Sequence, residues 1–219
     1  MQKIAIVGTT SWGITLGLLM ARKGDDVRIW ARTQREATRL TRKGLDPQRF
    51  PGVSLPEGVV ITSRIADAMQ EANAVILAVP STTMRQNISK IAPHVTRSMI
   101  VVSVSKGLET GSNKRMSQVI AEEISERFIG NICTLSGPNL SREIQQDLPA
   151  AAVVAAENIE TARKAQKILT CPNFCVFTNS DIIGVELGGA LKNIIALVPV
   201  SPTAFSMVIT PRPPSSRAA

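Results

Sequence analysis

Residues 1–15 constrain the fold of this chain more than any other stretch. An apolar run, Ile4–Val7, ends at Gly8, and Gly13 follows before a second apolar pattern begins. A buried strand, a tight glycine turn and the start of a helix produce this pattern. In such a turn, the first N–H groups of the helix point at a pyrophosphate. The middle glycine of G-x-G-x-x-G is Thr10 here, so a plain strand–turn–helix stays open as an alternative.

The next stretch completes a βαβ unit. We expect a helix over residues 13–23, a stop at Gly24 and a second strand over residues 27–30, which together give the usual length of about thirty residues. At the tip of the second strand, an acidic residue would hold the ribose 2′-hydroxyl of NAD. The chain has Arg32 there, and an arginine pairs with the 2′-phosphate of NADP. A solvated surface arginine is the alternative interpretation.

Strands and helices alternate along the rest of the chain. The patterns predict further strands at residues 59–61, 74–79, 100–104, 133–135, 150–156 and 175–177. They predict helices at residues 33–43, 65–70, 115–127, 159–169 and 181–197, and a helix capped by residues 80–82 and ending near residue 91. Near-continuous apolar strands in this alternation indicate an α/β fold with a doubly wound, mostly parallel, Rossmann-like sheet.

Several polar or glycine-containing segments follow directly after predicted strands. Pro80, Lys106 and Gly137 all lie where ligands bind in such sheets, beyond the carboxyl ends of the strands. The predicted helix over residues 181–197 carries adjacent glycines, Gly188 and Gly189, which cost roughly 1 kcal/mol each against alanine. Close approach of another backbone or of a substrate would explain them, and so would close helix–helix packing.

Composition limits the classes of function. The chain has 219 residues, is 44% hydrophobic and carries a net charge of +8. That length fits one domain, or one domain and part of another, and the charge suits a phosphorylated ligand, a nucleic acid or an anionic lipid. A spread of surface lysine and arginine is the simpler explanation. The sequence shows no aromatic-rich basic ribbon, signal peptide or membrane-spanning run, so we expect a cytoplasmic protein without nucleic-acid or membrane partners.

Cysteine and histidine usage gives no metal site. The three cysteines, Cys133, Cys171 and Cys175, form no C-x-x-C pair, and His94 is the single histidine. A structural zinc ion needs a fuller ligand set, and free thiols suit a reducing compartment. We therefore expect no metal.

Four blocks carry a resemblance to a known family. They lie at residues 6–13, 104–109, 135–138 and 186–193, and the last, Glu-Leu-Gly-Gly-Ala-Leu-Lys-Asn, is the most specific. Over residues 1 to about 197, the chain resembles the bacterial NAD(P)-dependent glycerol-3-phosphate dehydrogenases. The resemblance implies reversible hydride transfer between NADPH or NADH and dihydroxyacetone phosphate, which gives sn-glycerol 3-phosphate for phospholipid synthesis.

The resemblance also implies a role for each matched residue. Those implied to bind the cofactor are Gly8, Thr10, Ser11, Trp12, Gly13, Arg32, Lys106 and Ser141. Those implied to bind the substrate are Lys106, Gly137, Asn139, Lys192 and Asn193. Asn139 stands where the family often has serine. Lys192 would be the proton acceptor, and Lys106 would be the second catalytic residue.

A pair of lysines suits this reaction. Hydride delivery to a ketone builds negative charge on its oxygen, and a cationic amine stabilises that charge and donates the proton. To act near pH 7 the pKa of Lys192 has to fall, and burial beside Lys106 would lower it. Judged without the family, a solvated loop lysine and a helix-surface lysine are the alternatives.

The sequence departs from the family after residue 197. The family continues into a helical domain with further substrate contacts, whereas residues 198–219 are rich in proline, serine and arginine. We expect a dinucleotide-binding domain over residues 1–190, the start of the helical domain at residues 181–197, and a disordered tail over residues 198–219. Truncation or a frameshift would explain the tail, and a short protein whose tail has its own purpose is the alternative.

More than one function remains open at this point. The first is the dehydrogenase, and the second is a dinucleotide-binding remnant that does not turn over. A basic nucleic-acid binder is a third, and binding to duplex DNA that survives physiological salt would support it. The helix at residues 182–197 would be exposed without its covering domain, so we also expect self-association.

Overall fold

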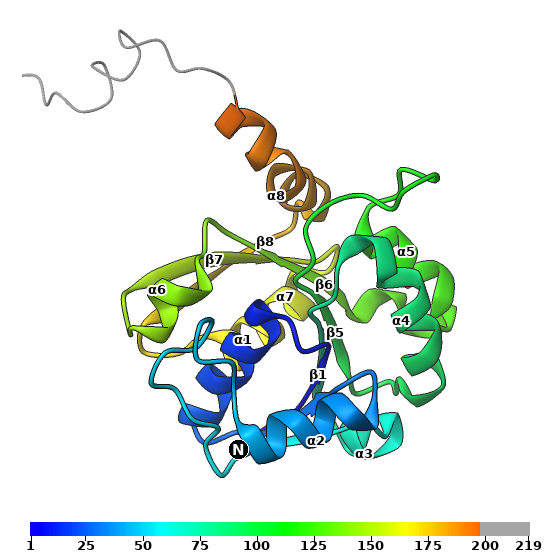
Figure 1. Ribbon diagram of the computed structural model, residues 1–219. Coiled ribbons are helices and arrows are strands. Elements are labelled where there is room, and N and C mark those ends of the chain that lie inside the picture. The colour runs from blue at the N-terminus through cyan, green and yellow to red at the C-terminus, as the bar shows by residue number, and fades with distance from the viewer. Residues whose placement is uncertain (198–219) are drawn as a thin grey trace, which may run out of the picture.

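The computed structural model describes residues 1–197, with side chains as far as residue 192, and the prediction for the tail at residues 198–219 lies outside it. The chain forms an eight-stranded sheet flanked by helices (Figure 1). Its strands are β1 (Lys3–Val7), β2 (Asp26–Trp30), β3 (Val59–Thr62), β4 (Ala74–Leu77), β5 (Ile100–Ser103), β6 (Ile132–Ser136), β7 (Ala150–Ala155) and β8 (Phe174–Asn179). The helices are α1 (Ser11–Arg22), α2 (Gln34–Lys43), α3 (Ile65–Met69), α4 (Met84–Ile91), α5 (Met116–Glu123), α6 (Ser141–Gln145), α7 (Ile159–Leu169) and α8 (Ile182–Leu197). Short 3₁₀ segments lie at Ser81–Thr83, Ala92–His94 and Glu126–Asn131.

The sheet is doubly wound and mostly parallel, as predicted. Its strand order is β3-β2-β1-β4-β5-β6-β7-β8. Strands β1 to β6 run parallel, β7 pairs antiparallel with β6, and β8 runs parallel to β7. Because β2 lies on one side of β1 and β4 on the other, the winding reverses between β1 and β4. A ligand crevice opens beyond the carboxyl ends of strands at such a reversal.

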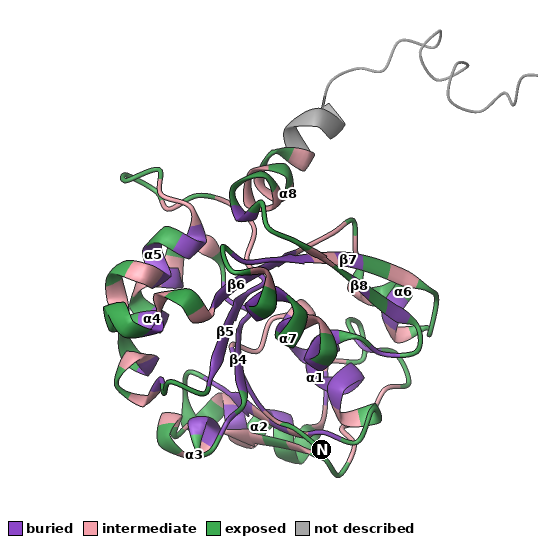
Figure 2. Ribbon diagram, turned by 180° about the vertical axis from the view of Figure 1, so that it is seen from behind, coloured by how far each residue is buried: buried purple, intermediate pink, exposed green. Residues whose placement is uncertain are grey.

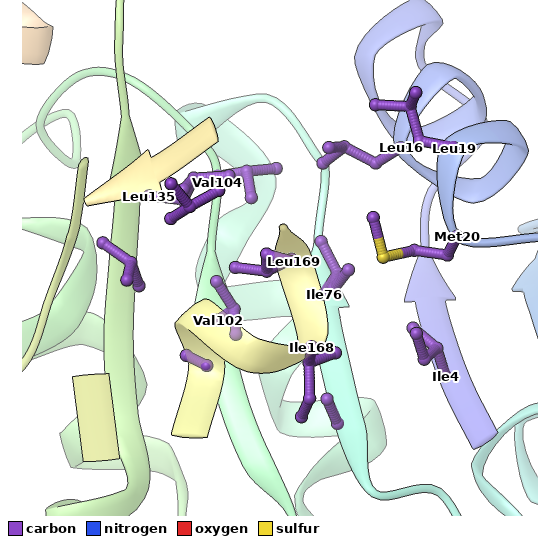
Figure 3. Packing of buried hydrophobic residues seen from close by; sticks show 14 of the residues in the cluster. Ile4, Leu16, Leu19, Met20, Ile76, Val102, Val104, Leu135, Ile168 and Leu169 are labelled. Carbon is purple, nitrogen blue, oxygen red and sulfur yellow. The ribbon is translucent and has the colours of Figure 1, made fainter. Parts of the chain in front are cut away.

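Apolar side chains cover one face of the sheet as far as β8 and the other face over its central strands. Successive residues of a strand point to opposite faces, so Ile4 belongs to one buried cluster and Ala5 to another. Figure 3 shows the first cluster, in which Met20 of α1 and Leu169 of α7 pack near Ile4 and Ile76. Residues of α3, α4 and α5 cover the second face, and the central strands are buried between the layers (Figure 2). The strand ends that border the crevice therefore belong to a packed core.

Local signals set many of the element ends. Helix α1 ends shortly before Gly24, which has a φ of +93°. Helix α2 begins after Thr33, whose side chain accepts a hydrogen bond from the N–H of Glu36. Helix α7 has the predicted bounds. These ends were predictable because glycine and capping side chains act within one turn of the chain.

One predicted helix was too long, and one short helix was not predicted. The helix predicted over residues 115–127 ends at Glu123, because Ile124 adopts an extended backbone with φ of −93° and ψ of 162°. Ile124 and Phe128 then both enter the second buried cluster. The short helix α6 was not predicted at all. Among the helices of residues 1–197, none is long and apolar enough to cross a membrane.

Candidate functional site

The turn between β1 and α1 packs directly against the end of β4. Gly8 has a φ of +106°, and a Cβ atom there would lie 2.7 Å from the carbonyl oxygen of Ala78. A Cβ atom at Gly13 would lie 2.8 Å from the Cβ of the same alanine. Neither position has room for a side chain, so both glycines are needed for this close approach. The contact holds the N-terminus of α1 over the crevice.

Thr10, which replaces the middle glycine of the motif, is the N-cap of α1. Its Oγ1 accepts a hydrogen bond from the N–H of Gly13 at 3.1 Å and donates one to the carbonyl oxygen of Ala78 at 2.9 Å. The cap satisfies one of the N–H groups that a helix start leaves unpaired. The N–H groups of Ser11 and Trp12 still begin the helix, where the helix dipole favours a phosphate. The threonine therefore preserves the anion-binding character of the turn.

A pocket of about 310 Å³ lies beyond the ends of β1, β4 and β5, and we call it the central pocket. Trp12 of α1 forms one wall and packs edge-on against Phe174, with ring centroids 6.2 Å apart. The full lining is Thr10, Trp12, Ala78, Val79, Pro80, Val104, Ser105, Lys106, Asn139 and Ser141. An apolar enclosure with a few convergent polar groups is typical of small-molecule sites.

A second pocket of about 270 Å³, the outer pocket, lies on the other side of the turn at the tip of β2. Its lining is Gly8, Thr9, Thr10, Trp30, Arg32, Glu36, Arg49, Val79, Pro80, Thr83 and Asn87. Thr10, Val79 and Pro80 line both pockets, so the central and outer pockets lie next to each other across the turn, and we refer to the two together as the groove. A groove that passes a helix N-terminus midway fits a dinucleotide, whose phosphates lie between its two nucleosides.

The outer pocket carries a second arginine that the sequence analysis did not identify. Arg32 lines this pocket, and Arg49 joins it from the loop after α2. The two arginines are far apart in the sequence, and Arg49 matches no motif, so only the folded chain brings them together. Glu36 also lines this pocket and accepts a hydrogen bond from the hydroxyl of Thr9.

Lys106 lies where the central pocket meets the end of β6. Its Nζ donates a hydrogen bond to the carbonyl oxygen of Gly137 at 2.8 Å. Burial, together with the nearby ammonium group of Lys192, lowers the pKa of Lys106 to about 8. At pH 7 the side chain is therefore still mostly protonated, and it has a positive charge to offer an anionic ligand.

An ion-pair network anchors the loop that carries Lys106. Glu109 accepts two hydrogen bonds from Arg85 of α4, from Nε at 2.8 Å and from Nη2 at 2.8 Å. Arg85 also contacts Glu122 and Glu123 of α5 at 2.7 and 2.8 Å. Such a two-pronged arginine–carboxylate pair fixes direction as well as distance. The loop is thus tied to both helices that flank it.

Helix α8 places Lys192 near Lys106. A third pocket of about 310 Å³, the helix pocket, is lined by Ser136, Gly137, Pro138, Val153, Gly184, Val185, Gly188, Gly189 and Lys192. A Cβ atom at Gly189 would overlap the hydroxyl of Ser136 and would lie 3.8 Å from Cγ of Lys106. A Cβ atom at Gly188 would meet nothing within 4 Å. Close approach therefore explains Gly189 but not Gly188.

The structure gathers most of the predicted site residues along one edge of the sheet. Thr10, Trp12, Lys106, Asn139 and Ser141 line the central pocket, Gly8 and Arg32 the outer pocket, and Gly137 and Lys192 the helix pocket. Ser11 and Gly13 belong to the turn but line none of these pockets. The side chain of Asn193 lies beyond the described side chains. Sequence reasoning also missed Glu186, which packs on the N-terminus of α5.

Comparisons with known proteins agree on one family. The family model for the N-terminus of NAD-dependent glycerol-3-phosphate dehydrogenase matches residues 3–162. A glycerol-3-phosphate dehydrogenase (NAD(P)+) of Dehalococcoides mccartyi is 54% identical over 203 residues, which covers 90% of this chain and 55% of that protein. One from Streptomyces avermitilis is 42% identical over 195 residues, which covers 89% of this chain and 58% of the relative. The chain thus spans about half the length of the curated relatives it matches.

The solved structures that resemble this chain include glycerol-3-phosphate dehydrogenases. The crystal structure of glycerol-3-phosphate dehydrogenase from Coxiella burnetii aligns with a TM-score of 0.79 at 30% identity, and covers 89% of this chain and 59% of that one. The structure of DsGPDH of Dunaliella salina aligns with a TM-score of 0.78 at 23% identity over 94% of this chain and 40% of its own, which shows a shared fold. With a family model that matches well over half of its residues, the chain belongs to the NAD-dependent glycerol-3-phosphate dehydrogenase family, of which it matches the N-terminal part.

Proposed function

We propose that this chain binds NADPH or NADH in the groove formed by the central and outer pockets. We further propose that it serves hydride transfer between that cofactor and dihydroxyacetone phosphate, giving sn-glycerol 3-phosphate. The observation that carries this proposal is the placement of Lys106 at the inner end of a groove that passes a helix N-terminus, with Lys192 beside it in the adjacent helix pocket. The names of the relatives, glycerol-3-phosphate dehydrogenase (NAD(P)+), support the same activity.

The residues of the groove divide between the parts of the cofactor. The N–H groups of Ser11 and Trp12 would receive the pyrophosphate at the start of α1. Arg32 and Arg49 would flank the adenosine ribose, where an arginine pairs with a 2′-phosphate. These two arginines would favour NADPH over NADH, because the 2′-phosphate, which only NADPH has, would interact with both positive charges.

The two lysines would stabilise charge and transfer a proton at the reacting carbonyl. When bound, NADPH supplies the hydride that goes to the carbonyl carbon. Lys106, which stays mostly protonated at pH 7 because its pKa is about 8, would stabilise the negative charge that develops on the oxygen. Lys192 would donate a proton to that oxygen, and would accept it from the hydroxyl group in the reverse direction. Gly137 and Asn139 would line the space between cofactor and substrate.

Cofactor binding is tested by tryptophan fluorescence. The chain has two tryptophans, and Trp12 lines the central pocket while Trp30 lines the outer pocket. We expect NADPH to quench this fluorescence in a saturable manner, and Arg32→Gln to weaken the quenching. A wild-type chain that is folded and shows no saturable quenching by either NADPH or NADH would contradict the proposal.

Turnover is tested separately, by NADPH oxidation on addition of dihydroxyacetone phosphate. We expect oxidation that Lys192→Ala abolishes, while cofactor binding by that variant stays intact. Binding without turnover would reject the dehydrogenase for this chain and support the dinucleotide-binding remnant as its function.

Helix α8 supports the expected self-association. Its exposed apolar side chains include Ile183, at 51% exposure, and Leu191, at 46%. We propose that they bury against a second copy of the chain in solution. Light scattering of the concentrated protein measures this, and a monodisperse monomer would count against it.

A further inference from the structure

Glu186 of α8 supplies the N-terminal cap of a different helix, α5. Its Oε1 accepts a hydrogen bond from the backbone N–H of Ser117 at 2.8 Å, and its Oε2 accepts one from the hydroxyl of the same serine at 2.6 Å. Arg115, at the N-cap position of α5, pairs with Oε2 at 2.6 Å. The carboxylate belongs to the block Glu186–Asn193 that carries the family resemblance, yet nothing in the proposed chemistry uses it.

The chemistry of this contact makes it a firm one. The Glu186 side chain is only 6% exposed, and that of Arg115 is 17% exposed. A carboxylate at a helix N-terminus interacts with the positive end of the helix dipole as well as with its hydrogen-bond donors. A buried carboxylate with each oxygen occupied has few other orientations to adopt, so its position fixes that of the backbone that carries it.

A second contact holds the same helix one turn further along. Gly189, three residues after Glu186, brings the α8 backbone against the Ser136 side chain at the end of β6. Residues 185, 189 and 192 face the helix pocket with Gly137 and Pro138. A helix held by one contact can still turn about it, whereas a second contact, one turn along and about 60° around the helix, restricts both its rotation and its distance from the sheet. Lys192 lies on the face that these contacts orient.

We propose that Glu186 is a positioning residue, which acts through its cap on α5 to set the rotation of α8 and so to hold Lys192 beside Lys106. This inference rests on the proposed role of Lys192 in the reaction. Glu186 itself contacts neither cofactor nor substrate in this scheme. Loss of its carboxylate would release the first turns of α8 and separate the two ammonium groups.

The experiment compares two buried carboxylates in the full chain. Asp25 is a matched control, because it is 5% exposed, accepts the backbone N–H of Gln2 at 2.9 Å and pairs with Lys23 at 3.3 Å. It lies at the opposite end of the sheet from the groove. Glu186→Ala and Asp25→Asn are made alongside Glu186→Gln, which keeps an acceptor for Ser117 but loses the negative charge that pairs with Arg115.

The first readout is the titration of Lys106 by NMR, assigned with Lys106→Arg. When α8 shifts, Lys106 becomes more exposed and loses the neighbouring charge, so its pKa rises from about 8 toward 10.5. We expect a rise of about one unit in Glu186→Ala, a smaller rise in Glu186→Gln, and none in Asp25→Asn even where that variant melts at a lower temperature.

The second readout is the yield of a cross-link between Lys106 and Lys192 with a short bifunctional amine reagent. We expect the yield to fall several-fold in Glu186→Ala and to stay at the wild-type level in Asp25→Asn. Neither readout requires cofactor or turnover, so the positioning role can hold where the proposed activity fails. Glu186 variants that melt lower yet keep the wild-type Lys106 titration and cross-link would show a structural role alone and overturn the proposal.

Discussion

The two ends of the ligand groove are held by different kinds of contact. At the turn end, backbone atoms meet directly, since Gly8 and Gly13 leave no room for a Cβ atom against Ala78. At the lysine end, charged side chains connect separate elements, as Arg85 does with Glu109 and Glu186 with Arg115. A Cβ atom added at the turn would clash with the backbone, whereas a charge pair at the lysine end can be removed by a substitution that creates no clash. The comparison predicts large stability effects at the turn and mainly functional effects around the lysines.

The largest effect is expected from Gly8→Ala. The new Cβ would meet the carbonyl oxygen of Ala78 at 2.7 Å, and φ is +106°. The substitution should lower the free energy of unfolding by about 3 kcal/mol, since backbone strain and steric overlap combine. Gly24→Ala is the matched control, because Gly24 has a φ of +93° with nothing within 4 Å, and it should cost only about 1 kcal/mol. Equal losses in urea unfolding would show that the close approach to β4 contributes nothing.

Arg32→Gln should affect ligand binding without changing stability. Arg32 is exposed and lines the outer pocket. Losing one charge beside the 2′-phosphate should weaken NADPH binding about tenfold and leave NADH binding nearly unchanged. Fluorescence titration with both cofactors measures the ratio. Equal losses of affinity for NADPH and NADH would show that the 2′-phosphate does not bind in the outer pocket.

Thr10→Ala tests the cap that replaces the middle glycine. It removes the acceptor for the N–H of Gly13 and the donor to Ala78, and should lower the free energy of unfolding by about 1 kcal/mol. Thr10→Ser keeps the hydroxyl and should stay within a few tenths of a kcal/mol of the wild type. Chemical denaturation of both variants decides whether the hydroxyl or the methyl group stabilises the turn.

Lys106→Met should stabilise the chain while it removes turnover. Burial beside Lys192 lowers the pKa of Lys106 to about 8, so the folded state is penalised while the lysine is charged. The variant should gain about 1 kcal/mol at pH 7, after discounting for partial exposure.

The pH dependence of that gain follows from the same shift. Between the folded value of about 8 and the ordinary value of 10.5, the unfolded chain binds more protons than the folded one, so wild-type stability rises with pH. The advantage of Lys106→Met should therefore shrink across this range. An advantage that is constant with pH in urea unfolding would assign the gain to packing instead of charge.

Much of the fold was determined by the sequence alone. Hydrophobic strands, the turn at Gly8 and the caps at Thr33 and Gly24 all act within a few residues, so their patterns predict the elements and the alternation predicts the sheet. The helix at residues 115–127 was predicted too long, because the packing of Ile124 and Phe128 in the core ended it. The family blocks named about half of the residues that line the three pockets, since three blocks lie at the ends of β1, β5 and β6 and the fourth lies in α8.

Only the tertiary structure decided how those strand ends meet. Arg49 joins Arg32, and Glu186 caps a helix 69 residues earlier in the chain, through contacts that no local pattern encodes. The lowered pKa of Lys106 likewise arises from burial and from Lys192 on another element. Local patterns record which conformations a segment prefers, whereas burial, charge pairing and the approach of α8 depend on atoms that are distant in sequence. The sequence therefore determined the framework and the candidate residues, and packing of the folded chain determined their chemistry.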